Sequence, residues 1–570
     1  MSNDPRERFE SLGRHCAPLA ASVLLLASGL YAEDTPQRLA PAIGARLASC
    51  ARLATDFRFP HTTITSVESV PSGSLQWGGR AIDTHCRVRG EMFRRTSPQD
   101  GKSYAIGFEM RLPNDWNGRF FYQANGGIDG TVATALGGGG PVPSPALQQG
   151  FAVISSDAGH TDGNDPSFGV DYQARLDYGY QAVAKLTPMA KALIAAAYGK
   201  GPDRSYIGGC SNGGRHTFVA MTRTPAEYDG YLAGAPGYRL PLAAIANQFG
   251  AQQYATVAPS PADLGSAFTA PERATLAQAV LARCDALDRA TDGLIQDTAA
   301  CQTTFDLDRD VPTCSGARDG SCLSGAQKAV IASIFTGAVD HRGNRFYASF
   351  PFDSGHNSAD SAYWEFLVPL KIDSAGTAII WGVPPANPKT FDGPAYALST
   401  PIDAMLAAVA ATDGTYRESA LSFMLPVEPA NLAALRRRGA RVMVYHGVSD
   451  AIFSVDDTTS WYEALRAANG GEASDFARFF RVPGMGHCAG GPATDQFDML
   501  TALVDWVEKG RPPDSVTAYA RGAGNAVGVN RDLPAGWSAH RARPLCPYPK
   551  VARRKAGAND LEAADSFRCE

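Results

Sequence analysis

Gly209-Cys210-Ser211-Asn212-Gly213 is the stretch of the 570-residue sequence that decides the fold. A short run with β character, Ser205 to Ile207, precedes it, and a helical run, Arg215 to Thr222, follows it. Because glycine makes up 58 of the 570 residues, a bare G-x-S-x-G pattern carries little weight, and a glycine-rich turn is the alternative. The order of strand, turn and helix predicts a sharp turn that exposes the serine hydroxyl beside a helix N-terminus.

A serine hydroxyl becomes a good nucleophile only when a base takes its proton, so a histidine oriented by a carboxylate should follow Ser211. The predicted strand Arg441 to Tyr445 runs into Asp450, and the predicted strand Phe476 to Val482 leads to His487. This order of serine, acid and histidine is that of an α/β-hydrolase. The competing histidines precede the acid, lie at a strand end or fall in an aperiodic tail: His160, His216, His446 and His540.

The oxyanion hole of such a site needs two backbone N–H donors. One is expected from Asn212, directly after the nucleophile, and the other from a loop after an early strand. The loop 125–130 follows the predicted strand Arg119 to Gln123, and Gly127 is the predicted second donor because glycine lets the backbone approach a substrate closely. The glycine run 137–140 is interpreted as a flexible turn without a catalytic role.

The surrounding sequence predicts an α/β class with a large insertion. From about residue 104 to 240, short β-rich runs such as Phe151 to Ser155 alternate with helical stretches such as Ala182 to Tyr198, as in a parallel sheet covered by helices. Residues 241–430 hold four cysteines, many prolines and glycines, and little alternation. We therefore predict an α/β-hydrolase domain formed by 33–240 and 431–570, and an inserted lid domain, 241–430, over the active site.

The N-terminus predicts export. Three arginines precede an apolar stretch, Ala17 to Leu30, and small residues around Ala32 mark a possible cleavage site, so residues 1–32 are predicted to be a signal peptide. A buried N-terminal helix is the alternative. No later segment offers about 18 apolar residues in a row, which argues against a membrane span. The net charge of −5, without a long basic run, argues against nucleic acid as a partner.

The cysteines suit a secreted or periplasmic protein. Loss of the leader removes one of eleven and leaves ten, an even number. Spacing makes Cys314 with Cys322, and Cys284 with Cys301, plausible local disulfides. Cys210 precedes the nucleophile and Cys488 follows the base, so a triad would bring these two thiols together. No C-x-x-C pair exists, and a metal–thiolate site is not favoured.

An acidic loop is the candidate metal site. Asp285, Asp288 and Asp292 place three carboxylates in eight residues, and such hard oxygen ligands suit Ca²⁺. The backbone carbonyls of Ala290 and Leu294 would complete the shell. The spacing is not that of an EF-hand, and a solvated acidic loop is the alternative.

Five short motifs carry a resemblance to a known family. They are Gly-Cys-Ser-x-Gly-Gly at 209–214, Gly-Ala-Pro-Gly-Tyr at 234–238, Cys-Asp-Ala-Leu-Asp at 284–288, Tyr-His-Gly-x-Ser-Asp at 445–450 and Pro-Gly-Met-x-His-Cys at 483–488. From about Cys50 onward the chain resembles the tannase and feruloyl esterase family, and within it the bacterial hydrolases of mono(2-hydroxyethyl) terephthalate. The resemblance implies structural calcium on the acidic loop and a disulfide between Cys210 and Cys488. By position it also implies the pairs Cys50–Cys86, Cys284–Cys301, Cys314–Cys322 and Cys546–Cys569.

The resemblance further implies a secreted serine esterase acting on small aromatic esters of the feruloyl or galloyl type. The residues expected to contact the substrate are Leu240, Trp364, His446 and Phe453. Terephthalate monoester hydrolases of the family grip the free carboxylate with a lid arginine, whereas here the only strong cation in 364–387 is Lys371. Hydrolysis of that monoester is therefore the alternative activity. A catalytically silent, calcium-stiffened binding module on a hydrolase fold is the alternative from another class.

Overall fold

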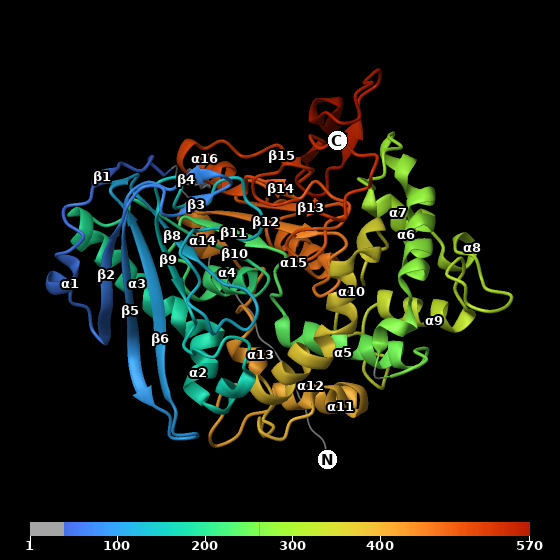
Figure 1. Cartoon of the computed structure of the whole chain (residues 1–570), viewed down its shortest axis with the longest axis horizontal. Coiled ribbons are helices and arrows are strands. Elements are labelled where there is room, and N and C mark those ends of the chain that lie inside the picture. Colours follow the sequence, from blue (N-terminus) through green and yellow to red (C-terminus); the bar gives the residue numbers. More distant parts are fainter. Residues whose placement is uncertain (1–38, 262) are drawn as a thin grey trace, which may run out of the picture. The chain divides into compact units, whose positions relative to one another are not determined.

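A mixed sheet of nine strands forms the centre of the protein (Figure 1). The computed structural model describes residues 39–261 and 263–570. The strands lie in the order β13-β12-β11-β10-β8-β9-β6-β5-β2. Their bounds are β2 (Thr62–Val70), β5 (His85–Thr96), β6 (Ser103–Pro113), β8 (Arg119–Gln123), β9 (Ala152–Ser156), β10 (Arg204–Cys210), β11 (Gly230–Gly234), β12 (Arg441–Gly447) and β13 (Ala477–Val482).

The parallel half of the sheet positions the predicted catalytic residues. Strands β9, β8, β10, β11, β12 and β13 pair in parallel, and the five strands predicted from sequence all belong to this half. Since the carboxyl ends of parallel strands meet at one edge, the residues after β10, β12 and β13 gather there. These are Ser211, Asp450 and His487. The α/β fold class is confirmed.

The antiparallel half of the sheet was not predicted. β5 pairs with β2 on one side and β6 on the other, and β6 joins the parallel half through an antiparallel pairing with β9. Arginines break the apolar pattern of β5, and carboxylates of neighbouring segments neutralise several of their charges. For example, Arg89 pairs with Glu109 of β6, and Arg95 pairs with Asp171.

Helices cover both faces of the sheet and bury two separate apolar clusters. On one face α3 (Ala182–Tyr198) and α4 (Asn212–Arg223) bury residues such as Leu186 and Phe218. On the other face α16 (Met499–Lys509) buries Leu503 against the strands. The observed α3 has the bounds that the sequence predicts, and it ends at Gly199 with a left-handed φ of 75°, a common way to end a helix.

The lid is helical throughout. Its longer helices are α5 (Leu240–Ala255), α6 (Ala270–Cys284), α9 (Gly325–Phe335), α10 (Ala359–Phe366) and α12 (Ile402–Ala410), with the short α7 (Thr298–Thr304) beside α6. Side chains of α6, α9 and α10 share a third apolar cluster. The described residues nevertheless all belong to one compact unit, so the proposed division into two domains stays a prediction.

The C-terminal segment returns to the lid and carries one of five disulfides. β15 (Val516–Tyr519) pairs with β16 (Ala542–Leu545), and β17 (Ala552–Arg554) pairs with β18 (Phe567–Cys569). All five disulfides predicted from the resemblance are present: Cys50–Cys86, Cys210–Cys488, Cys284–Cys301, Cys314–Cys322 and Cys546–Cys569. The predicted leader lies outside the described residues. None of the described helices is both long enough and apolar enough to cross a membrane.

Candidate active site

The predicted nucleophile lies in a strained turn between β10 and α4. Ser211 has φ 67° and ψ −126°, a region that residues other than glycine rarely occupy and that commonly marks a functional site. Glycine is required on both sides. A Cβ on Gly209 would lie 2.1 Å from the carbonyl oxygen of Ala124, and one on Gly213 would lie 2.3 Å from the same atom. The turn 209–213, the nucleophile elbow, is thus held against the loop that follows β8.

The predicted base and acid form a buried hydrogen-bonded pair. Nδ1 of His487 lies 2.8 Å from Oδ2 of Asp450. Nε2 of His487 is buried and has no hydrogen-bond partner among the described residues. In a Ser-His-Asp triad this second nitrogen takes the serine proton, so the arrangement leaves the required nitrogen free.

Besides His487, three further groups hold the carboxylate of Asp450. Oδ1 accepts hydrogen bonds from the backbone N–H groups of Ile452 and Phe453, each at 3.0 Å, and Nε2 of His446 lies 3.2 Å from Oδ2. Burial opposes ionisation of this carboxyl. The charges and hydrogen bonds of His487 and His446 outweigh burial and hold the pKa of Asp450 well below its usual range. The acid is therefore a carboxylate at neutral pH.

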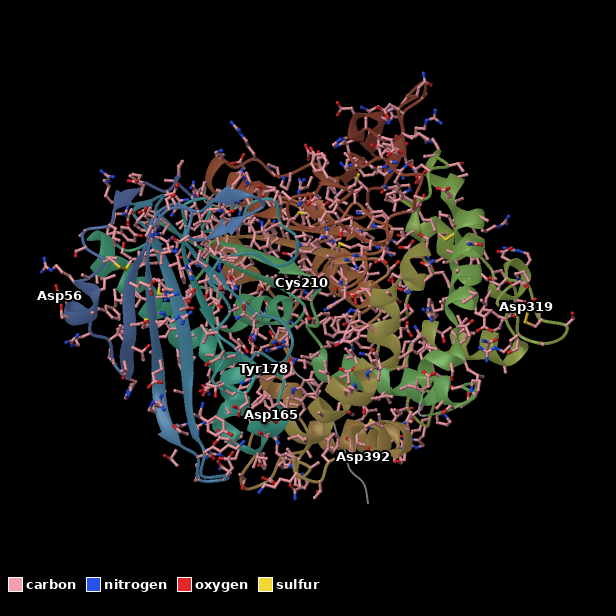
Figure 2. All side chains as sticks on the ribbon, viewed as in Figure 1. Asp56, Asp165, Tyr178, Cys210, Asp319 and Asp392 are labelled. Carbon is pink, nitrogen blue, oxygen red and sulfur yellow. A yellow bond between two sulfur atoms is a disulfide. The ribbon has the colours of Figure 1, made fainter. Side chains whose placement is uncertain are left out.

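A disulfide joins the neighbours of the predicted nucleophile and the predicted base, Cys210 and Cys488. The Cα atoms of Cys210 and Cys488 lie 6.0 Å apart (Figure 2). The glycine run 137–140 packs behind this bond: a Cβ on Gly139 would lie 2.9 Å from the Cys210 nitrogen, and one on Gly140 would lie 3.0 Å from the Cys488 oxygen. The run therefore has a packing role that the sequence interpretation did not anticipate.

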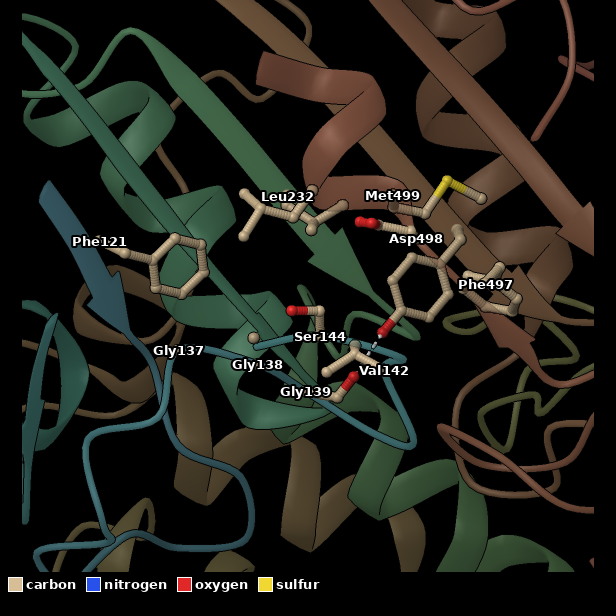
Figure 3. Close-up of a pocket in the computed structure, with 13 residues that line it drawn as sticks. Phe121, Gly137, Gly138, Gly139, Val142, Ser144, Leu232, Phe497, Asp498 and Met499 are labelled. Atoms are coloured by element: carbon tan, nitrogen blue, oxygen red, sulfur yellow. Dashed lines mark hydrogen bonds between the residues drawn. The ribbon is translucent and has the colours of Figure 1, made fainter. Parts of the chain in front are cut away.

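A small cavity borders the elbow, with Gly209 among its lining residues. Its volume is about 30 Å³, and Phe121, Leu232 and Phe497 are among its apolar walls (Figure 3). The Tyr445 hydroxyl donates a hydrogen bond of 3.3 Å to the Gly139 carbonyl at its edge. No triad residue lines this cavity, and we assign it no part in catalysis.

The loop that should supply the second oxyanion donor runs beside the nucleophile. A Cβ on Gly126 would lie 3.7 Å from the Ser211 Cβ, and Gly127 has a positive φ of 63°. Sequence reasoning missed the contact that holds this loop: Asp129 Oδ2 accepts a hydrogen bond from the side-chain amide of Asn212 and contacts Nε2 of His216, both at 2.8 Å. Asp129 therefore ties the two predicted donor residues together.

The four residues predicted to contact the substrate occupy different environments. The ring of Trp364 lies 4.6 Å from that of His487, and the ring of Phe453 lies 5.3 Å from it, both edge to face. Leu240 is buried at the start of α5, so its substrate role stays a prediction. His446 differs from the prediction. Its ring has no exposed surface and contacts Thr458 and the Phe453 carbonyl, so we assign it to the support of Asp450.

Lid residues hold the catalytic loops, and sequence reasoning did not find them. Asp360 Oδ2 accepts a hydrogen bond of 3.2 Å from the His487 backbone N–H, while Oδ1 accepts one of 2.9 Å from the Trp364 indole.

A second lid carboxylate, Asp353, joins the loops of acid and base. Its Oδ2 accepts from the Ser449 hydroxyl at 3.0 Å and from the Gly484 N–H at 2.8 Å. Ser449 precedes the acid and Gly484 lies three residues before the base. The lid thus holds both loops of the candidate site in place.

The acidic loop concentrates negative charge in a buried place. Asp288 accepts from the N–H groups of Ala290 and Gln296, while Asp292 pairs with the guanidinium of Arg543. Burial, together with the carboxylates of Asp292 and Asp285, raises the pKa of Asp288 to about 7. In the part of the chain that the structure describes, no three His, Cys, Asp or Glu side chains form a group that could hold a metal unaided.

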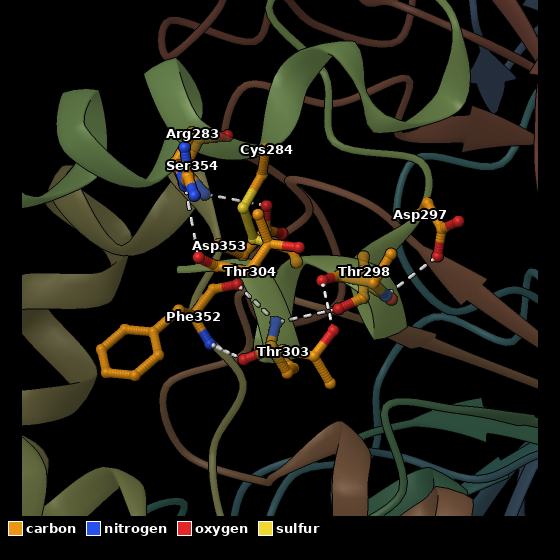
Figure 4. The surroundings of a disulfide bond; sticks show 12 residues. Arg283, Cys284, Asp297, Thr298, Thr303, Thr304, Phe352, Asp353 and Ser354 are labelled. Carbon is orange, nitrogen blue, oxygen red and sulfur yellow. Dashed lines mark hydrogen bonds between the residues drawn. A yellow bond between two sulfur atoms is a disulfide. The ribbon is translucent and has the colours of Figure 1, made fainter. Parts of the chain in front are cut away.

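A calcium ion in this loop would therefore need backbone oxygens as well as carboxylates. Asp285 and Asp288 have no cationic partner in the described structure, and hard oxygen donors of this kind are those that Ca²⁺ takes. The disulfide Cys284–Cys301 closes the loop (Figure 4). The residues are thus compatible with calcium, with Arg543 already neutralising Asp292.

Comparison with known proteins identifies the family. The model of a family described as "Tannase and feruloyl esterase" matches residues 86–570. Mono(2-hydroxyethyl) terephthalate hydrolase of Piscinibacter sakaiensis is 38% identical over 528 residues, which are 86% of this chain and 85% of that protein. A probable feruloyl esterase B-1 of Neosartorya fischeri is 28% identical, over 81% of this chain and 82% of that protein.

Solved structures show the same fold. The crystal structure of feruloyl esterase B from Aspergillus oryzae superposes with a TM-score of 0.72 at 24% identity, covering 91% of this chain and 99% of that one. Family model, relatives and fold agree with one another. The chain therefore belongs to the tannase and feruloyl esterase family and is a carboxylic ester hydrolase.

Proposed function

We propose that this hydrolase is a serine esterase that cleaves esters of aromatic acids, of the feruloyl or galloyl type, with Ser211, His487 and Asp450 as its triad. The observation that carries the proposal is the pairing of His487 Nδ1 with Asp450 at 2.8 Å, which leaves Nε2 free on a loop that a disulfide ties to the elbow of Ser211. Geometry and role, rather than sequence position, are the criteria for such a triad.

In the proposed reaction the Ser211 hydroxyl attacks the ester carbonyl while His487 takes its proton. Asp450 orients the imidazole and stabilises its cationic form. The backbone N–H groups of Asn212 and Gly127 donate to the oxyanion. The protonated His487 then donates its proton to the departing alcohol, and a water molecule releases the acid from Ser211 by the same steps.

The aromatic part of the substrate would lie against the lid. Trp364 and Phe453 present their rings at the base, and such surfaces hold an aromatic acyl group by burial and edge-to-face contact. Lys371 is exposed, and a lone flexible lysine is a poor substitute for a bidentate arginine on a carboxylate. Neutral aromatic esters should therefore be preferred over a terephthalate monoester.

Hydrolysis of mono(2-hydroxyethyl) terephthalate is the second candidate, supported by the relative of that name at 38% identity. Steady-state kinetics on methyl ferulate, methyl gallate and mono(2-hydroxyethyl) terephthalate separates the two. The absence of a lid arginine that would bind the desolvated carboxylate of the monoester costs roughly 2–5 kcal/mol. We therefore expect kcat/KM for the monoester to be tens to thousands of fold lower than for the neutral aromatic esters. A higher kcat/KM for the monoester would reverse the assignment.

A covalent serine probe distinguishes the esterase from a silent binding module on a hydrolase fold, because only the esterase should react with it. A fluorophosphonate should label the intact protein at Ser211, because the hydroxyl is activated by a positioned base, and should leave Ser211→Ala unlabelled. Failure to label the folded wild-type protein would favour the binding module.

We also propose structural calcium and an extracellular or periplasmic location. Asp285 and Asp288, with Asp292 and the carbonyls of Ala290 and Leu294, would hold the ion, whose charge would offset that of the carboxylates. Five disulfides support an oxidising compartment.

A further inference from the structure

Arginines of this chain repeatedly bind carboxylates through one edge of the guanidinium, formed by Nε and Nη2. Arg119 binds Glu508 in this way, Arg318 binds Glu272, and Arg521 binds Asp495. The two parallel N–H groups of this edge match the two oxygens of an oxyanion, which makes such pairs short and strong.

Arg481, on β13, has this same edge buried and empty. Neither its Nε nor its Nη2 has a hydrogen-bond partner among the described residues. The carboxylate of Asp456 is 3.8 Å from Nη2, beyond hydrogen-bond distance, and accepts instead from the Ser349 hydroxyl at 2.9 Å. Buried N–H donors without hydrogen bonds are costly, so something else should satisfy this edge.

Arg481 lines a cavity of about 40 Å³ where three parts of the chain meet. The end of β13 supplies Arg481, the lid supplies Gln296 and Thr298, and the C-terminal segment supplies its residues 546 and 548–552. Gln296 is only 8% exposed, and its side-chain Nε2 also lacks a partner among the described residues. Two independent sets of unsatisfied donors therefore line one cavity.

We propose that this cavity binds a small oxyanion through the side-on edge of Arg481, with the Gln296 amide as a further donor. Donors without acceptors need a partner with acceptor oxygens, and an oxyanion offers several of them in one group. One water needs roughly 10–15 Å³, so the cavity has room for a group the size of sulfate or acetate. It is too small for an aromatic acid, and no triad residue lines it.

Such an anion would join the lid, the sheet and the C-terminal segment at one point. The nearby carboxylate of Asp297 is already neutralised by Arg553, so it does not compete for Arg481. Because the site exists only when all three segments are in place, bound anion would stabilise their joint fold.

The test is a calorimetric titration of sulfate into dialysed protein at constant ionic strength, balanced with sodium chloride. We expect saturable binding of one sulfate per chain, and a Tm higher by about 1 °C at a tenfold excess over Kd. Arg481→Met should abolish both effects. Arg481→Lys keeps the charge but loses the paired donors, and should bind at least about tenfold more weakly; it decides the test if the methionine variant does not fold.

Arg568→Gln is the matched control, since it removes the same charge from an exposed arginine of the C-terminal segment. This variant should bind sulfate as the wild type does. Acetate in place of sulfate distinguishes a site for carboxylates from one for tetrahedral oxyanions, and binding of either one supports the proposal. Absence of saturable binding, equal binding by Arg481→Met, or binding of chloride alone would overturn it.

Discussion

Ser211 has a backbone conformation that an unconstrained residue would leave, and the surrounding packing holds it there. Replacement by alanine keeps the backbone demand and removes only the hydroxyl. We expect Ser211→Ala to lose about 10⁴-fold or more in kcat, because triad members act as a unit, with little change in Tm. The measurement is kcat on methyl ferulate together with thermal unfolding. Activity at a tenth of wild type would place the nucleophile elsewhere.

Ser449 contributes through the lid rather than by contact with substrate. Its hydroxyl donates to Asp353 and accepts from the Gly355 N–H, so Ser449→Ala leaves two buried polar groups short of a partner. The free energy of unfolding should fall by about 1–3 kcal/mol. Since the acid loop then loses a constraint, kcat should fall severalfold while KM changes little.

Ser460→Ala is the control for this variant, because the Ser460 hydroxyl bonds only within α15 (Val455–Ala468) and is exposed. A rise in KM at unchanged kcat in Ser449→Ala would contradict a positioning role.

The sequence predicts the triad because each proposed member follows a strand at the same sheet edge, and that order is visible in the chain. It did not find Asp353 or Asp360. Their hydrogen bonds to Ser449 and His487 join residues 96 and 127 positions apart, and no motif marks either aspartate. His446 was misjudged because its motif position says nothing about which side of Asp450 its ring occupies.

Among the elements, the strands that were predicted are the apolar ones buried on both faces. β2, β5 and β6 form the half of the sheet whose charged residues alternate with apolar ones, so β5 shows a mixed burial pattern and weak apolar periodicity. β11 is a five-residue strand with glycine at both ends, which gives little β signal. The lack of alternation predicted that residues 241–430 are an insertion, but it did not predict their helices. The packing of these helices depends on contacts between distant residues, which composition does not encode.

The disulfide between Cys210 and Cys488 joins the end of β10 to the loop after β13. We expect the double variant Cys210→Ala/Cys488→Ala to lose at least about tenfold in kcat, since a misplacement of about 1 Å is enough for such a loss. Peptide mapping of the wild type under non-reducing conditions should recover the linked pair.

Cys314→Ala/Cys322→Ala is the control for the loss of a disulfide as such, because that bond closes a short loop, with a separation of eight residues, in the lid. Its kcat should stay near that of wild type. Full activity in the double variant at 210 and 488 would show that the bond is dispensable.

Helix α10 carries a partly buried carboxyl, Glu365, and we expect it to make the stability of the protein depend on pH. Burial raises the pKa of Glu365 to about 7, although the Tyr254 hydroxyl and Arg273 oppose this shift. A raised acid pKa means that the folded state holds the proton more tightly than the unfolded chain. The contribution of Glu365 to the free energy of unfolding is therefore fully present below pH 4.5, and it is lost as the pH rises through about 7.

Glu365→Gln keeps an acceptor for Tyr254 and cannot ionise. Relative to wild type, its Tm should be higher at pH 8 and nearly equal at pH 4.5, as measured by differential scanning calorimetry. Glu428→Gln, at an exposed position, should show no such dependence. An equal Tm difference at both pH values would rule out Glu365 as the source.

For the whole molecule, calcium should matter more for stability than for turnover. The acidic loop is tied to the C-terminal segment through Arg541 and Arg543, and it contains none of the predicted triad residues. Chelation should lower Tm while the folded enzyme keeps most of its initial rate, because the ion binds the folded state and not the unfolded chain. Asp288→Ala should remove this response, and Asp308→Ala, an exposed lid carboxylate, should retain it.

The packing of helix α5 limits where along the chain a lid can be exchanged between relatives. Its first half contributes Ile245 to the cluster against the main sheet, and its second half contributes Ala251 and Tyr254 to the cluster inside the lid. A chimera cut at residue 240 would import a foreign set of core side chains along with the new lid. A recombination point near Gly250 would keep each half of the helix with the cluster that it completes. The new lid would still have to retain the side chains that reach the main cluster from later lid segments, such as Trp381, Met405 and Phe423.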